Sequence, residues 1–208
     1  MRRQRRRLRP WQRRRAAQRL VAAVRRLPVW RQARHVAAYM PADGEIDVLP
    51  LLREARRQGK RTYLPVLHPL GRGLRFRPWA PGSPMRANRF GIPEPRARRH
   101  ERSGRRLDLV LAPLVAFDDH GNRLGMGGGF YDRTFAFRSR LARWRRPRLV
   151  GVGYAFQRVP RLERRHWDVR LDTVLTEAGR HRPDTDPVRG NATCQTLPQQ
   201  SADKKEGR

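Results

Sequence analysis

A glycine-rich run between two charged residues is the segment of this sequence best suited to chemistry. Arg123 precedes the run, Asp132 ends it, and four glycines stand between them within five residues, at positions 125, 127, 128 and 129. Because glycine has no Cβ atom, such a stretch can turn its backbone N–H groups toward one point and approach a ligand closely. Backbone donors beside a guanidinium suit a polyphosphate, and a nearby carboxylate suits Mg²⁺, which prefers oxygen ligands.

The run departs from the common phosphate-binding patterns. It lacks the Gly-Lys-Ser/Thr ending of a P-loop. A G-x-G-x-x-G pattern begun at Gly125 or Gly127 meets Phe130 or Asp132 where its third glycine should stand. On spacing alone, a glycine-rich surface turn before a helix is an equally good interpretation.

The flanking segments favour the ligand site over the surface turn. Residues 107–113 are an apolar run typical of a buried strand, and residues 130–144 have the pattern of a helix. A strand, a glycine loop and a helix in this order place the glycines at the end of a strand and the start of a helix. Anionic ligands are favoured at that position.

The remaining elements predict an α/β fold. Apolar spacing indicates helices over residues 8–27 and 47–58, and strands over residues 35–40, 61–66, 149–155 and 172–176. Residues 74–79 alternate as an antiparallel edge strand would, residues 81–95 are loop-rich, and residues 96–106 suggest a surface loop or short helix. This alternation of strands and helices favours a sandwich with a mostly parallel sheet. We expect one domain over residues 1–178 and a disordered basic tail over residues 179–208.

The charge balance invites a nucleic-acid interpretation but does not support a specific one. The chain has 208 residues and a formal net charge of +31, and only three of its 49 basic residues are lysines. The arginines are scattered and have no interleaved aromatic pattern of the kind found in RNA-binding motifs. We therefore expect no specific nucleic-acid partner, only salt-sensitive non-specific binding to polyanions.

Cysteine content and hydropathy indicate a cytoplasmic protein. The single cysteine, Cys194, excludes a disulfide within one chain. No apolar run approaches the roughly 18 residues of a membrane span, so we expect no membrane partner. The arginine-rich start resembles a transit peptide, but an exposed basic helix is the favoured interpretation.

Six ordered blocks together resemble the 5-formyltetrahydrofolate cyclo-ligase (5,10-methenyltetrahydrofolate synthetase) family. They are DGEID at 43–47, GKRTYLP at 59–65, NRFGIPEP at 88–95, APLVAFD at 112–118 leading into RLGMGGGFYDR at 123–133, GVGYAFQ at 151–157 and HWDVRLD at 166–172. The resemblance covers roughly residues 5–177 and implies a three-layer α/β/α fold. It also implies a monomeric ligase that uses ATP and Mg²⁺ to convert 5-formyltetrahydrofolate, with or without a polyglutamate tail, to 5,10-methenyltetrahydrofolate.

The resemblance also implies a set of site residues. Arg123 and Tyr131 are the implied catalytic residues, and Asp132 and Asp168 the implied Mg²⁺ ligands. The folate site falls on Met40, Glu45 and residues 126–130. The implied nucleotide site comprises Arg123, Leu124, Gly125, Met126, Gly127, Gly128, Gly129, Phe130 and Tyr131.

Each assignment has a purely structural alternative. Glu45 could cap the helix that follows it, and Asp168 could pair with arginine 164, 165 or 170. Met40 could belong to the core, and Phe130 and Tyr131 could simply pack. The order of the blocks favours the functional interpretation of Glu45, Asp132 and Asp168.

One family element has no match. The family usually opens with Lys-x-x-Leu-Arg, whereas residues 6–10 here fit a later element, and we hypothesise a mis-assigned start. Two other functions compete with the ligase: a non-catalytic polyanion-binding protein on the same fold, and a nucleotide-dependent enzyme with another substrate.

Overall fold

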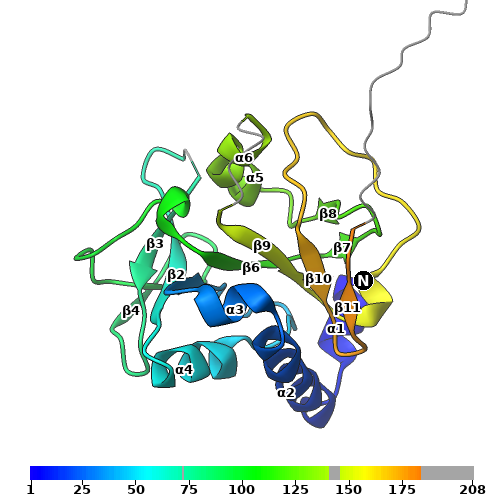
Figure 1. The fold of residues 1–208 in the computed structure, drawn as a ribbon, viewed down its shortest axis with the longest axis horizontal. Coiled ribbons are helices and arrows are strands. Elements are labelled where there is room, and N and C mark those ends of the chain that lie inside the picture. Colours follow the sequence, from blue (N-terminus) through cyan, green and yellow to red (C-terminus); the bar gives the residue numbers. More distant parts are fainter. Residues whose placement is uncertain (72, 141–145, 184–208) are drawn as a thin grey trace, which may run out of the picture.

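A seven-stranded sheet organises the chain in the computed structural model, which describes residues 1–71, 73–140 and 146–183 (Figure 1). The strand order is β11-β10-β9-β6-β1-β2-β3. Two small hairpins lie outside the sheet, β4 (Met85–Ala87) with β5 (Pro93–Pro95), and β7 (Ala116–Phe117) with β8 (Arg123–Leu124). The sheet strands are β1 (His35–Ala37), β2 (Arg61–Leu67), β3 (Leu74–Pro78), β6 (Leu109–Pro113), β9 (Arg148–Val152), β10 (Thr173–Leu175) and β11 (Arg180–His181).

The interior of the sheet is parallel and its two edges are antiparallel. Strands β2, β1, β6, β9 and β10 pair in parallel, and β3 and β11 each join an edge in the opposite direction. The expected edge strand over residues 74–79 is therefore confirmed. So is the mostly parallel sheet.

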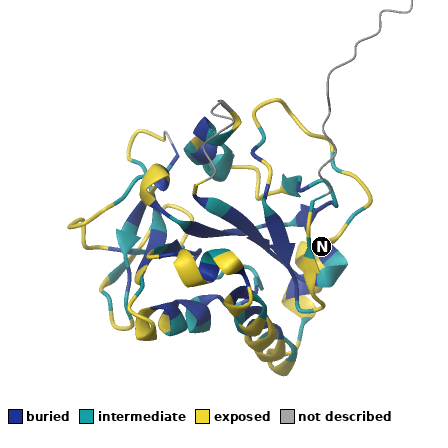
Figure 2. Ribbon diagram, in the orientation of Figure 1, coloured by how far each residue is buried: buried dark blue, intermediate teal, exposed yellow. Residues whose placement is uncertain are grey.

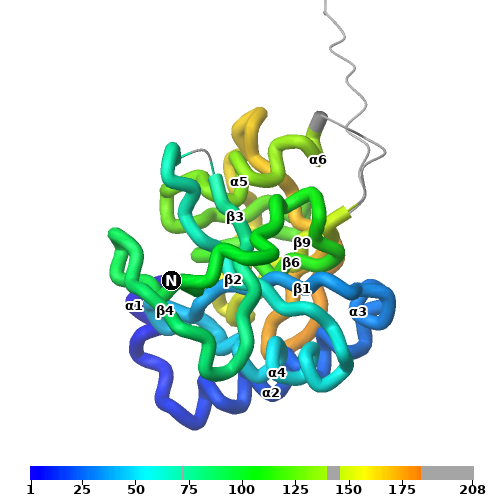
Figure 3. Tube along the Cα trace, turned by 90° about the vertical axis from the view of Figure 1, so that its left-hand side faces the viewer, coloured from blue at the N-terminus to red at the C-terminus, as the bar shows by residue number. Residues whose placement is uncertain are grey.

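Helices cover both faces of the sheet and make three layers. Helices α2, α3 and α4 lie on one face, and α5 and α6 on the other (Figures 1 and 3). The predicted three-layer α/β/α sandwich is confirmed. The helices are α1 (Arg2–Arg7), α2 (Pro10–Arg25), α3 (Pro28–Gln32), α4 (Leu49–Arg57), α5 (Phe130–Phe135) and α6 (Phe137–Arg140), with 3₁₀ turns η1 (Gly104–Arg106) and η2 (Ala155–Gln157).

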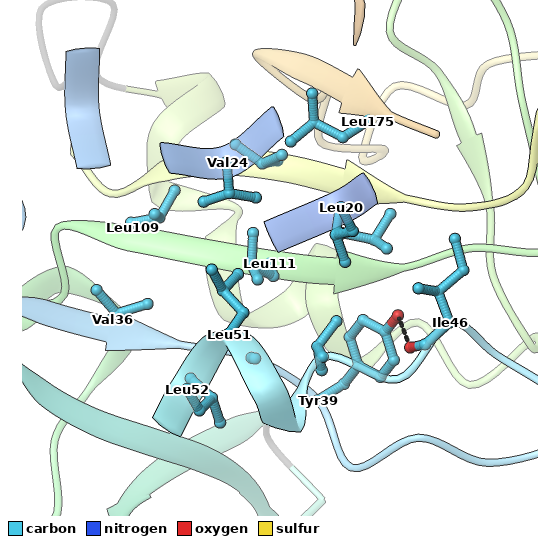
Figure 4. Close-up of a cluster of buried hydrophobic side chains, with 14 of the residues drawn as sticks. Leu20, Val24, Val36, Tyr39, Ile46, Leu51, Leu52, Leu109, Leu111 and Leu175 are labelled. Atoms are coloured by element: carbon cyan, nitrogen blue, oxygen red, sulfur yellow. Dashed lines mark hydrogen bonds between the residues drawn. The ribbon is translucent and has the colours of Figure 1, made fainter. Parts of the chain in front are cut away.

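The alternation of side chains along the central strands builds two cores. In β6, Leu109 and Leu111 pack with α2, α3 and α4, whereas Val110 and Ala112 pack on the other face with Phe135 of α5. Figure 4 shows the first of these clusters, and Figure 2 shows the buried strands between more exposed helices. A strand buried on both faces has no polar side, which explains the continuous apolar run over these residues.

The order of the strands defines a ligand-binding crevice. Helix α4 connects β1 to β2 on one face, and α5 and α6 lie on the other face between β6 and β9 in the sequence. Strands β1 and β6 are neighbours, so the chain turns in opposite directions after them. Open α/β sheets bind ligands beyond the carboxyl ends of the strands at such a switch point. The loops that follow β1 and β6 therefore frame the expected site.

Three sequence expectations were wrong in detail. The helix expected over 130–144, of which residues 141–144 lie outside the described residues, breaks after Phe135. Phe135 and Phe137 are both buried, and residues two apart do not share a face of one continuous helix. The glycine run follows the hairpin strand β8 rather than the long strand before it. Residues 81–95 contain the β4–β5 hairpin.

The disordered tail predicted over residues 179–208 starts too early in the sequence. Arg180 and His181 form β11, paired with Leu175 and Val174 of β10. Residues 184–208, which contain Cys194 and most of the predicted tail, lie outside the described residues.

Candidate active site

The glycine run lies between a short hairpin and the first turn of α5. The backbone N–H of Val115 donates to the carbonyl of Leu124 over 2.7 Å, which fixes where the run begins. Gly127 has φ of 89° and Gly129, at the N-cap of α5, has φ of 57°. These left-handed conformations favour glycine, so the glycines are required by the backbone path as well as available to a ligand.

Arg123 and Asp132 close the run at its two ends. The Arg123 Nη2 lies 2.9 Å from the Asp132 Oδ1, and the two side chains are 6% and 17% exposed. The guanidinium carbon of Arg123 also lies 5.6 Å from the centre of the Tyr131 ring. A guanidinium held in this way is available to a phosphate without a large loss of side-chain entropy.

The loop that carries Asp168 contacts this pair. The backbone N–H of Val169 donates to the Asp132 Oδ1 over 3.1 Å, which brings the loop of Asp168 against α5. The Asp168 carboxylate accepts a hydrogen bond from the backbone N–H of Arg165 over 2.8 Å. Within the described chain it makes no ion pair with arginine 164, 165 or 170.

The donor set fits Mg²⁺ better than a metal that needs a protein cage. The described residues contain no cluster of three or more histidine, cysteine or acidic side chains around one point. Mg²⁺ is usually held by one or two carboxylates together with substrate phosphates and water. Asp132, at the end of the glycine run, and Asp168, in the loop that contacts Asp132, would supply that number of carboxylates.

The loop after β1 carries two acidic residues with contrasting surroundings. Asp43 accepts hydrogen bonds from Arg2, Arg5 and Arg6 of α1, at 2.6, 2.8 and 2.8 Å. The hydrogen bond from Arg2, followed by those from Arg5 and Arg6, lowers the pKa of Asp43 to about 2. Helix α1 is thus docked on this loop by charge.

Glu45 is the more deeply placed of the two acids. Its side chain is 12% exposed, and it accepts one hydrogen bond, from the backbone N–H of Ala42 over 3.1 Å. Burial raises its pKa to about 7, against the lowering effects of the Ala42 hydrogen bond and the Arg5 charge. The N-cap of α4 is Val48, and the N–H of Leu49, the first residue of the helix, donates to Asp47 rather than to Glu45. The capping alternative for Glu45 is therefore wrong.

The charge of Glu45 affects the pKa of two nearby tyrosines. Burial, together with the Glu45 carboxylate, raises the pKa of both Tyr39 and Tyr131. The Tyr39 hydroxyl donates to the carbonyl of Ile46 (Figure 4). The buried Tyr131 hydroxyl has no hydrogen-bond partner among the described residues. Tyr131, which follows the glycine run, therefore lies near enough to the loop after β1 for the charge of Glu45 to act on it.

Apolar side chains of the predicted site are divided between the core and the surface. Met40 is partly buried and packs against the first core. This agrees with the structural alternative for Met40, a place in the core. Leu124 and Met126 are 51% and 56% exposed, unusually so for large apolar side chains. Phe130 makes an edge contact with Phe90, with ring centres 6.0 Å apart. Exposed apolar groups beside a polar loop suit an aromatic ligand.

A groove of about 860 Å³ opens between α2, α4 and the loop after β1. Glu45 and Asp43 line one end of it, and Arg13 and Arg14 of α2 line its side. The glycine run is not among the residues that line this groove. Glu45 therefore lines this groove, whereas the glycine run lies outside it.

Comparison with known proteins matches this arrangement. Residues 1–177 match the profile of the 5-formyltetrahydrofolate cyclo-ligase family. The chain belongs to this family. It is 42% identical over 180 residues to the 5-formyltetrahydrofolate cyclo-ligase of Escherichia coli (strain K12), covering 85% of this chain and 96% of that protein. Over 149 residues it is 44% identical to the cyclo-ligase of Haemophilus influenzae, covering 70% of this chain and 76% of that protein.

A solved structure of the family shares the fold. The NMR structure of Aquifex aeolicus 5,10-methenyltetrahydrofolate synthetase superposes with a TM-score of 0.74 at 30% identity, covering 94% of this chain and 95% of that chain. Within the part of the chain described, no helix combines the length and hydropathy needed to cross a bilayer.

Sequence reasoning missed the role of the first helix. Five arginines stand within residues 1–7, and their pattern does not reveal which one is buried. Arg5 is 1% exposed. The close approach of the two segments is visible only in the fold, where a Cβ atom at Gly44 would lie 2.9 Å from the Arg5 backbone.

Proposed function

We propose that this chain converts 5-formyltetrahydrofolate to 5,10-methenyltetrahydrofolate with ATP and Mg²⁺, releasing ADP and phosphate. One observation carries the proposal. The glycine run, closed by Arg123 and Asp132, lies in the connection that follows β6, and Glu45 lies in the connection that follows β1, the two connections that diverge at the switch point of the sheet. Both are inside the segment that matches the family.

The chemistry requires activation of a poor leaving group. The formyl oxygen attacks the γ-phosphorus of ATP, and ADP departs. N10 then attacks the formyl carbon and gives up its proton, which is released with the phosphate. The C–O bond breaks, and the phosphate leaves with the former formyl oxygen. The protein's work in such a reaction is to position the reactants and stabilise charge.

The residues of the glycine run hold the phosphates in this proposal. Backbone N–H groups from 125–129 and the Arg123 guanidinium donate to phosphate oxygens. Tyr131 stays protonated, because burial raises its pKa, so its unpartnered hydroxyl can donate to the same group. Asp132 and Asp168 would hold Mg²⁺, which supplies neutralisation of phosphate charge when bound.

The folate lies between the run and the loop after β1. The Glu45 carboxylate accepts from the hydrogen-bond donor edge of the pterin. Met40, Met126 and Phe130 supply apolar contact to the rings. We further propose that the enzyme acts as a cytoplasmic monomer and that its positive charge attracts polyglutamylated substrate.

A spectrophotometric assay tests the proposal directly. Purified protein is mixed with 5-formyltetrahydrofolate, Mg²⁺ and ATP, and the near-ultraviolet absorbance of the methenyl product is followed. Growth of that band only when ATP is present is the expected result. A flat trace from folded protein would overturn the proposal, and binding of a generic RNA by the same sample would then favour a polyanion-binding role.

A further inference from the structure

A buried arginine of the first helix contacts both loops that frame the switch point. Arg5 is 1% exposed and is among the largest fully buried side chains of the described chain. Its Nη1 donates to the carbonyl of Leu114, directly after β6, over 3.1 Å. Its Nη2 donates to Asp43, in the loop after β1, over 2.8 Å. One guanidinium therefore ties the two sides of the crevice together.

The same guanidinium faces Glu45. Arg5 Nη1 lies 3.8 Å from Glu45 Oε1, which is within ion-pair range but longer than a hydrogen bond. Its Nε is buried and makes no hydrogen bond to the described residues. Burying an arginine costs free energy unless its charge is paired and its N–H groups are hydrogen-bonded. The pair with Asp43 alone leaves some of the N–H donors of Arg5 without a partner among the described residues.

The other charged and titratable groups around Glu45 cannot replace Arg5. Arg2 lies on the same helix but is half-exposed and bonded to Asp43. Asp43 itself bears a like charge that raises the pKa of Glu45. The charge of Glu45 also acts on Tyr39, Tyr131 and Tyr154, and each has a pKa that burial raises, which keeps it neutral. Arg13 and Arg14 of α2 line the same groove as Glu45, but neither forms an ion pair with it. Among the described residues, Arg5 is the one cation in ion-pair range of Glu45.

We propose that Arg5 is a positioning residue that holds the Glu45 carboxylate charged and aimed into the folate site. The inference rests on the proposed function, since it assigns Glu45 to the pterin. A carboxylate accepts hydrogen bonds from both donors of a pterin edge, whereas a protonated carboxyl would present a donor to a donor. Arg5 thereby determines the pH range in which folate binds.

The test compares Arg5→Gln with Arg6→Met. Gln keeps a donor for the Leu114 carbonyl, which Gln157 also contacts at 2.9 Å, but it removes the charge. Arg6 is a matched control, because it pairs with Asp43 and is 56% exposed. The KM for 5-formyltetrahydrofolate, the KM for ATP and kcat are measured from pH 6 to pH 9.

We expect Arg5→Gln to raise the folate KM about fivefold at pH 7, as a rise of about one pKa unit in Glu45 would reduce its ionised fraction. The effect should fall below twofold at pH 9, with the KM for ATP and kcat within twofold throughout. Arg5→Lys should restore the wild-type profile, and Arg6→Met should match it. An increase that is independent of pH would mean that Arg5 is only structural, and would overturn the proposal.

Two further measurements separate this inference from the proposed function. In the Glu45→Gln background, Arg5→Gln should have no additional effect on folate KM, and an additive effect would contradict the inference. Carbon-13 NMR titration of Glu45 needs no activity, and its midpoint should be higher in Arg5→Gln than in the wild type. An unshifted midpoint in an active enzyme overturns the inference alone. A shifted midpoint in a protein that never forms methenyl product overturns the proposed function and leaves the Arg5–Glu45 coupling standing.

Discussion

The guanidinium of Arg123 and the carboxylate of Asp132 meet across the glycine run, with Nη2 and Oδ1 separated by 2.9 Å. Oδ1 also accepts the backbone N–H of Val169, so one oxygen of Asp132 holds both the run and the loop of Asp168. The Oδ2 atom accepts no hydrogen bond from the residues that the structure describes. One oxygen of Asp132 is thus structural, and the other is available to a cation.

Asp132→Asn should separate these two roles. An amide oxygen can still accept from Arg123 and Val169, so we expect the free energy of unfolding to fall by less than about 1 kcal/mol. Loss of the anionic oxygen should reduce turnover at least about 100-fold and raise the Mg²⁺ concentration needed for half-maximal rate. Asp119→Asn is the control, because Asp119 pairs with Arg158 on the surface and should leave turnover unchanged. Equal losses in the two variants would contradict the assignment.

Gly125→Ala tests whether a ligand approaches the backbone of the run. A Cβ atom at Gly125 meets nothing within 4 Å, and its φ is not left-handed. Stability should therefore change by less than about 0.5 kcal/mol, while the KM for ATP rises about tenfold. Gly127 is equally uncrowded but has φ of 89°, so Gly127→Ala should cost about 1 kcal/mol of stability as well. Thermal unfolding and ATP titration of both variants provide the check, and an unaltered ATP KM in both would refute the contact.

Gly44→Ala should be far more harmful than the same change at Gly59. Both glycines are left-handed, with φ of 75° and 73°, but only at Gly44 would the new Cβ lie 2.9 Å from backbone atoms of Arg5. We expect a loss of about 1 kcal/mol for Gly59→Ala and about 3 kcal/mol for Gly44→Ala. Urea denaturation of the two variants measures the difference. Equal losses would show that α1 does not pack on this loop.

Asp43→Asn should lose stability only where the carboxylate is charged. Its arginine partners, Arg2 first, lower its pKa from an ordinary 3.8 to about 2. A lowered pKa gives stability that is fully present above pH 3.8 and disappears as the pH falls through about 2. At pH 7 we expect a loss of about 1–2 kcal/mol, reduced from the full linkage value because Arg2 and Arg6 are half-exposed. Urea unfolding at pH 7 and pH 2.5 should show the wild type and variant converging at low pH.

Glu45→Gln should show the opposite pH dependence. Burial raises the pKa of Glu45 from 4.5 to about 7, so the native state retains a proton that the unfolded chain has released. Native stability therefore falls as the pH rises from 4.5 to 7, and a side chain that cannot ionise escapes this loss. Relative to the wild type, the variant should gain on the order of 2–3 kcal/mol between pH 4.5 and pH 7.5. A difference between the two proteins that is constant over this range would contradict the raised pKa.

Alternation of apolar residues was sufficient to predict most of the sheet. Residues 61–66 and 74–79 were predicted correctly as strands, because each carries a period of two or a continuous apolar run. The break in the helix after Phe135 could not be predicted, since it depends on a core shared with Phe76 of β3 and Phe137. Strand β11 was missed because its two residues, Arg180 and His181, have no strand pattern and pair only through β10.

The residues of the candidate site could be predicted from the sequence, but the charge interactions between them could not. The glycine run and the acids at 45, 132 and 168 stand out by type and by the blocks around them. The convergence of Arg2, Arg5 and Arg6 on Asp43 joins residues about 40 positions apart. A run of arginines contains no information about which member is buried, because that depends on the tertiary position of the helix.

The two antiparallel edges of the sheet affect how copies of this chain meet. A strand at the edge of a sheet offers unpaired backbone groups on which another molecule can add a strand. Here β3 carries Arg75, Arg77 and Pro78, and β11 is two residues long and begins with Arg180. Proline has no N–H to offer, and like charges on both edges repel a second sheet. The chain as a whole has a formal net charge of +31. The residues at the two edges of the sheet thus disfavour edge-to-edge aggregation. A concentrated solution of the folded protein should therefore resist aggregation better than its many β-strands would suggest.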